Sequence, residues 1–109
     1  MTLVVGRVDG PRIAIASDTL ITEHDRPLAL RDGVVKSCML PGDICVSFCN
    51  SPVSAERAFK EFAAQFLLGT GFSRVVSFFE QSGRETGNDY LIAFCHPARL
   101  VKIAEGKTR

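Results

Sequence analysis

Short apolar runs fill the first half of the chain and predict mainly β-structure there. The run Thr2–Val8 is rich in β-branched residues, and the Asp9-Gly10 dipeptide that follows it favours a tight hairpin. Because both faces of the next run are apolar, we expect this hairpin to lie between two layers. The charged, proline-containing stretch Glu23–Arg31 predicts a surface loop. Four strands are therefore expected before any helix: Thr2–Val8, Arg12–Ser17, Val34–Leu40 and Ile44–Cys49, with a turn at Pro41-Gly42-Asp43.

Helical spacing begins after Asn50. Ser51 can accept hydrogen bonds from the amides at a helix start, and Pro52 is tolerated at the first helical position. After the Gly69-Thr70-Gly71 break, Ser73 is expected to cap a second helix that runs to about Gln81, before a polar connector. The first helix is predicted to bury one stripe: Ala55, Ala58, Phe59, Phe62, Ala63, Phe66 and Leu67. The connector and the last strands are expected at Gly83–Asp89, Tyr90–Cys95 and Leu100–Ala104.

The order of strands, then helices, then strands is typical of an α+β domain with helices on one face of antiparallel sheet. No internal repeat or low-complexity linker divides the chain, so we interpret residues 1–109 as one domain. In this reading the second apolar face of the sheet has no partner. A large apolar face seldom stays wet on a monomer, so we expect self-association or cover from further polypeptide.

The composition argues against several functional classes. The chain has 109 residues, of which 46% are apolar, and a net charge of +1 that would not attract nucleic acid or an anionic membrane. No apolar run approaches the roughly 20 residues that span a bilayer. Arg7 and Asp9 interrupt any secretory signal pattern. We therefore expect a cytoplasmic protein without a nucleic-acid or membrane partner.

The cysteines and histidines lack the spacing of a metal site. The four cysteines form no Cys-x-x-Cys pair, and His24 and His96 lie in predicted loops. We interpret the cysteines as small core residues in a reducing compartment, with a disulfide or a catalytic thiol, Cys49 first, as the alternative. No metal and no cofactor are expected.

Thr2 is a candidate nucleophile because of its place behind Met1. If Met1 is removed, Thr2 carries both a hydroxyl and an α-amine, and the neutral amine can take the hydroxyl proton as attack begins. The structural alternative is a threonine that merely opens a strand.

The residues that follow Thr2 resemble the proteasome β-subunit and HslV-type branch of the N-terminal nucleophile (Ntn) hydrolases. Asp18 stands at the end of Ile15-Ala16-Ser17-Asp18, Thr22 completes an Ala-x-Asp-x-x-x-Thr pattern, and Lys36 lies on the next predicted strand. The likeness extends through the strands at residues 44–49 and 90–94. It covers nearly the whole chain but only about the first half of the family's domain. The fold that the resemblance implies for this chain is therefore half of an αββα sandwich.

The resemblance implies a role for each matched residue. Thr2 would be the catalytic nucleophile and base, Lys36 a cation that favours the neutral amine, and Asp18 the carboxylate that orients Lys36. Thr22 would align a peptide substrate as an added strand. Ser47, or a near neighbour, stands where the family has the glycine whose amide stabilises the oxyanion, and the glycines expected around residues 49–51 are absent.

Two functions are compatible with these residues. The first is a threonine peptidase that cleaves peptide amide bonds through an acyl-enzyme, in a ring of identical chains and with an ATP-dependent unfoldase as a possible partner. The second is a non-catalytic scaffold or interaction domain, or an inactive fragment of a longer chain. The residues also have structural readings: Asp18 could end a strand, Thr22 could be an ordinary loop residue, and Lys36 could point to solvent from an edge strand.

Overall fold

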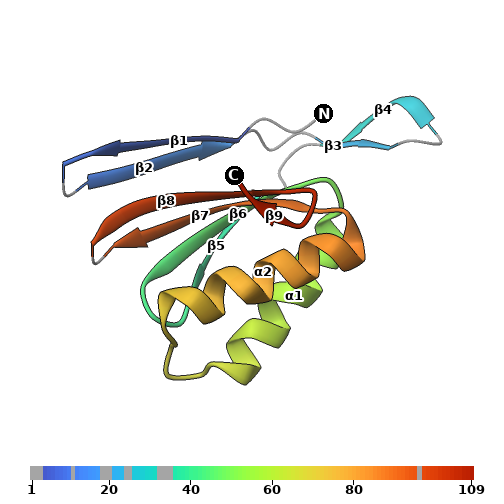
Figure 1. The fold of residues 1–109 in the computed structure, drawn as a ribbon. Coiled ribbons are helices and arrows are strands. Elements are labelled where there is room, and N and C mark those ends of the chain that lie inside the picture. The colour runs from blue at the N-terminus through green and yellow to red at the C-terminus, as the bar shows by residue number, and fades with distance from the viewer. Residues whose placement is uncertain (1–3, 11, 18–20, 24–25, 32–35, 96) are drawn as a thin grey trace.

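Three layers form the structure, a computed structural model that describes residues 4–10, 12–17, 21–23, 26–31, 36–95 and 97–109. A five-stranded antiparallel sheet lies in the middle, two helices cover one of its faces, and a two-stranded hairpin lies across the other (Figure 1). The α+β class, the antiparallel sheet and the helices on one face are confirmed.

The central sheet has the strand order β5-β6-β7-β8-β9, and every neighbouring pair is antiparallel. Its strands are β5 (Ser37–Leu40), β6 (Ile44–Cys49), β7 (Asp89–Cys95), β8 (Ala98–Ala104) and the short β9 (Lys107–Thr108). The predicted strand Ile44–Cys49 is confirmed at both ends. It lies between two neighbours, which explains why its residues are apolar or small on both faces.

Side-chain alternation along β6 divides the two faces of the sheet. Ile44, Val46 and Phe48 are buried in the core beneath the helices. The core continues through β7, β8 and the helices, and its members are Leu40, Ile44, Val46, Phe48, Ala55, Phe62, Val75, Phe79, Tyr90, Ile92, Val101 and Ile103. Each fully buried side chain of the size of Phe62 contributes about 1.5–3 kcal/mol to the hydrophobic free energy of folding.

The first helix, α1 (Pro52–Gln65), begins as predicted. Ser51 is its N-cap, and the Ser51 hydroxyl accepts a hydrogen bond from the amide of Ser54 at 3.3 Å. The buried stripe is confirmed for Ala55, Ala58 and Phe62. It is wrong for Leu67, which follows the helix and is 75% exposed.

The second helix, α2 (Phe72–Thr86), is longer than predicted and starts at a different cap. Its N-cap is Gly71 instead of Ser73, and it ends at Gly87 in the left-handed conformation. The residues read as a polar connector from Gly83 onward are therefore helical up to Thr86. Gly83 lets α2 approach the backbone of Gly106 closely, because it has no side chain. A Cβ at Gly83 would stand 3.2 Å from the Cα of Gly106.

The hairpin over the second sheet face consists of β1 (Val4–Asp9) and β2 (Arg12–Ser17). Its expected position between two layers is wrong within the described residues, because its outer face is open and Val5 is 53% exposed. The strand β2 has the predicted bounds, and Gly10 in the turn has a φ of 58°. The hairpin covers the sheet face that the sequence pattern left without a partner (Figure 1).

A further hairpin replaces the surface loop expected at Glu23–Arg31. It consists of β3 (Ile21–Glu23) and β4 (Arg26–Arg31), with a register shift between Thr22 and Glu23. Proline in a strand is confined to edge strands, and both strands of this two-stranded sheet are edge strands, so Pro27 is compatible with β4.

Candidate active site

A cavity of about 430 Å³ opens between β1 and the face of the central sheet that the helices leave uncovered. Val4, Val5 and Gly6 line it from the hairpin. From the sheet it is lined by Ser47, Cys49, Asp89, Tyr90, Leu91 and Lys102. The contacting strands are thus β1 on one side and β6, β7 and β8 on the other, at the end of the sheet where β6 stops and β7 starts.

Gly6 allows β1 to lie close on the sheet beside this cavity. A Cβ at Gly6 would stand 2.8 Å from one methyl carbon of Leu91 and 3.1 Å from one of Leu100, so any side chain here would push against both leucines. This contact cannot be predicted from the sequence, because an isolated glycine in a strand indicates only a close approach or a bulge and not its partner.

Lys36 is 1% exposed and lies immediately before β5, not in the middle of a strand as predicted. Its carbonyl accepts a hydrogen bond from the amide of Phe48 at 3.1 Å, which extends the β5–β6 ladder by one residue. The reading of Lys36 as a solvent-facing edge residue is therefore wrong. Lysine is almost never fully buried unless its charge is matched, so the burial of Lys36 makes it a candidate functional residue.

Ser47 lines the cavity, and its side chain is buried. Its hydroxyl is 2.6 Å from the hydroxyl of Ser37, directly across the β5–β6 pair. Successive backbone N–H groups of a strand point to opposite neighbouring strands. The N–H of Phe48 points to β5, so the N–H of Ser47 points to β7, where Ser47 is paired with Leu91. The first amide beyond the ladder belongs to Asn50.

The turn after β6 has the backbone shape that the missing glycines would favour. Asn50 has a φ of 92°, in the left-handed region that asparagine tolerates better than most residues. Sequence reasoning noted the missing glycines but did not predict how the turn is held. Two asparagine side chains tie it to the start of β7, and nothing in the local pattern distinguishes either from an ordinary polar loop residue.

Thr2 and Asp18, two of the three predicted catalytic residues, lie outside the described residues. The described residues next to them in this hairpin, Val4 and Ser17, pair with each other at the end of the hairpin where Val4 lines the cavity. Thr22 lies in β3, opposite Leu30, and its side chain is outside the described part. Of the five predicted site residues, the structure thus describes the surroundings of Lys36 and Ser47.

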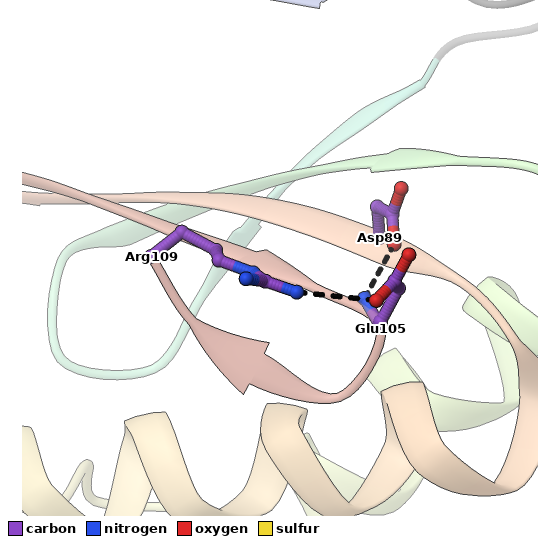
Figure 2. A network of polar contacts seen from close by, with 3 residues as sticks. All are labelled: Asp89, Glu105 and Arg109. Atoms are coloured by element: carbon purple, nitrogen blue, oxygen red, sulfur yellow. Dashed lines mark hydrogen bonds and ion pairs between the residues drawn. The ribbon is translucent and has the colours of Figure 1, made fainter.

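Two opposite charges add polarity to the cavity. Asp89 and Lys102 line it from β7 and β8. The Asp89 carboxylate accepts a hydrogen bond from the amide of Glu105 at 3.1 Å, and the Glu105 carboxylate is 3.1 Å from the Arg109 guanidinium (Figure 2). Sequence reasoning missed Asp89 and Lys102, since a charge at either end of a strand is unremarkable without its neighbours.

The cysteine chemistry is only partly as expected. All four cysteines are described, and no disulfide joins any two of them within this chain. Cys49 lines the cavity, whereas Cys95 is exposed and is not the core residue that was predicted. Burial raises the pKa of the Cys38 and Cys45 thiols, which keeps them protonated and poorly nucleophilic. Among the described residues, no group of three or more His, Cys, Asp or Glu side chains is placed to hold a metal ion.

Comparison with known proteins identifies no family. The chain matches no protein-family model, and no curated protein is similar enough to give a match. Neither helix in the described part of the chain is long and apolar enough to cross a membrane.

Proposed function

We propose that this chain is an amide hydrolase of the proteasome-like Ntn type, with Thr2 as its nucleophile after removal of Met1. The burial of Lys36 is the observation that carries the proposal. An edge lysine with only a structural role would extend its ammonium into water, because removing that charge from water costs several kcal/mol. A protein that keeps such a charge in its interior has a reason to keep it, and activation of a nucleophile is one.

The chemistry requires one base, one cation and one oxyanion donor. The Thr2 α-amine takes the hydroxyl proton as the oxygen attacks a carbonyl carbon, and it later gives that proton to the leaving amine. The Lys36 cation favours the neutral form of this amine. Water then attacks the acyl-enzyme ester, which releases the carboxylic acid and restores Thr2.

The cavity supports binding of an extended peptide next to β1. Its walls combine apolar side chains with one carboxylate and one ammonium, a mixture suited to a chain that carries both amide groups and side chains. The proposal assigns the oxyanion to the Asn50 amide, in the turn that follows the cavity residue Cys49. The proposal also includes three partners: further copies of this chain in an oligomer, a peptide or protein substrate, and an ATP-dependent unfoldase.

The decisive experiment combines intact-mass measurement with hydrolysis of peptide p-nitrophenyl esters and coumarin amides. We expect the mature chain to begin at Thr2 and to gain the mass of the acyl group when treated with the ester. Thr2→Ala should abolish both acylation and turnover, whereas Thr2→Ser should retain them in part. Thr70→Ala, in the connection between the helices, is the matched control and should behave as wild type.

A second variant tests the role of the buried cation. Lys36→Met keeps a long side chain but removes the charge, and it should lower turnover by about 100-fold or more. If Met1 is fully retained, or if Thr2→Ala hydrolyses peptides as well as wild type, the nucleophile assignment is refuted. The non-catalytic scaffold would then be the better description.

A further inference from the structure

Two asparagine side chains fasten the turn after β6 to the start of β7. Asn88 is fully buried, and its side-chain amide pairs with both backbone groups of Ser51: its oxygen accepts from the Ser51 amide at 2.8 Å, and its nitrogen donates to the Ser51 carbonyl at 3.1 Å. The Asn50 side chain donates to the carbonyl of Gly87 at 2.8 Å. The two short segments 50–51 and 87–88 are thus joined by three hydrogen bonds, which we call the asparagine clamp.

The asparagine clamp lies at the rim of the cavity. Cys49 and Asp89 form the last pair of the β6–β7 ladder, and both line the cavity. The residues just beyond this pair are Asn50, which follows β6, and Asn88, which precedes β7, and both belong to the clamp. Side-chain hydrogen bonds therefore continue the ladder past its last backbone pair, at the point where the backbone must turn into α1.

The backbone held by the clamp is in an uncommon conformation. Asn50 has a φ of 92°, and a residue with a side chain stays in this region only where its surroundings enforce it. Asn88 supplies such enforcement because a buried amide that pairs with both the N–H and the C=O of one residue fixes the two peptide units on either side of that residue. Loss of the Asn88 side chain would leave the Ser51 amide without this partner, whereas the Ser51 carbonyl would keep the hydrogen bond from the Ala55 amide, and the turn would be free to relax.

We propose that Asn88 is a positioning residue of the candidate active site, which holds the Asn50–Ser51 backbone so that the Asn50 amide stays at the cavity rim. This inference rests on the proposed function and deepens it. Asn88 itself does not touch the reacting atoms. Its effect on catalysis passes through the turn, where a displacement of about 1 Å can cost 100-fold in rate.

The test compares two Asn88 variants with a control of similar stability. Asn88→Ala removes the clamp, whereas Asn88→Asp keeps an acceptor for the Ser51 amide but loses the donor to the Ser51 carbonyl. Gly42→Ala is the control, because Gly42 has a φ of 92° in the β5–β6 turn, at the other end of β6. Temperatures are chosen at which all three variants are folded, and kcat and KM are measured for the same coumarin amide.

We expect Asn88→Ala to lower kcat by about 100-fold with little change in KM, and Asn88→Asp to give a smaller loss. Gly42→Ala should retain the wild-type kcat although it also loses stability. Hydrogen exchange followed by NMR should show faster exchange at Asn50 and Ser51 in Asn88→Ala, and unchanged exchange in the core strands.

Equal kcat values for Asn88→Ala and Gly42→Ala would overturn the positioning role. Unchanged exchange at Asn50 and Ser51 would overturn the clamp itself. If the wild-type protein shows no hydrolysis that depends on Thr2, the proposed function fails, and the exchange measurement still decides whether Asn88 holds the turn.

Discussion

One hydrogen bond between α2 and β7 allows a quantitative test of how the helices are attached to the sheet. The Ser82 hydroxyl and the Tyr90 hydroxyl are 2.7 Å apart, and the two residues are 8% and 2% exposed. Tyr90→Phe removes only the hydroxyl. The ring stays packed, because its centroid lies 4.9 Å from that of Phe79 and the contact does not involve the oxygen.

The expected loss comes from the partner that is left behind. Tyr90→Phe leaves the buried Ser82 hydroxyl without this hydrogen bond, which costs about 1–3 kcal/mol of the free energy of unfolding. Ser82→Ala leaves the Tyr90 hydroxyl in the same position and should cost a similar amount. The double variant removes both polar groups, so its loss should be clearly smaller than the sum of the two single losses.

Urea unfolding of the four proteins measures this double-mutant cycle, and thermal unfolding gives an independent check. A loss of 1 kcal/mol lowers the Tm of a domain of this size by roughly 4–8 °C. We expect single-variant shifts in this range or above, with unchanged m values. Strictly additive losses, or wild-type stability for Tyr90→Phe, would refute the conclusion that these two buried hydroxyls satisfy each other.

Two further predictions concern the turns and the thiols. Gly106→Ala should lower the free energy of unfolding by about 2–4 kcal/mol in urea, because Gly106 has a φ of 71° and a Cβ there would overlap the Arg84 side chain. Gly10→Ala is the control: Gly10 has a φ of 58° but open space around it, so the loss should be about 1 kcal/mol. Equal losses would show that the Arg84 contact does not matter. Iodoacetamide should modify exposed Cys95 at a lower pH than Cys45, since burial raises the pKa of the Cys45 thiol and lowers its thiolate fraction. Peptide mapping from about pH 7 to 10 checks this order, and equal rates would contradict it.

The local elements that sequence predicted best carry their own signals. Ile44–Cys49 is a run of apolar and small residues between turn residues, and Ser51-Pro52 is a helix start that needs no distant partner. The hairpin strand Arg12–Ser17 follows a dipeptide that closes turns by itself. In each case the determining interaction spans only a few residues.

The errors occur where a distant segment decides the local structure. α2 continues through Gly83 because the backbone near Gly106 packs against it, and a glycine in a polar stretch does not reveal that contact. Charge and proline predict a loop over Glu23–Arg31, yet pairing with β3 makes Arg26–Arg31 a strand. At both places, contact with another segment determined the secondary structure, against the prediction from the local amino-acid composition.

The candidate site divides in the same way. Its chemical residue types, a threonine behind Met1, a lysine and a strand-end aspartate, are present in the sequence alone and determine which reaction is conceivable. Only the tertiary structure buries Lys36, brings β1 over the sheet to form a cavity, and sets Asn88 against Ser51. The physical reason is that reactivity belongs to side chains, whereas burial and hydrogen-bond partnership depend on segments far apart in the chain, such as Ser51 and Asn88, which are separated by 37 residues.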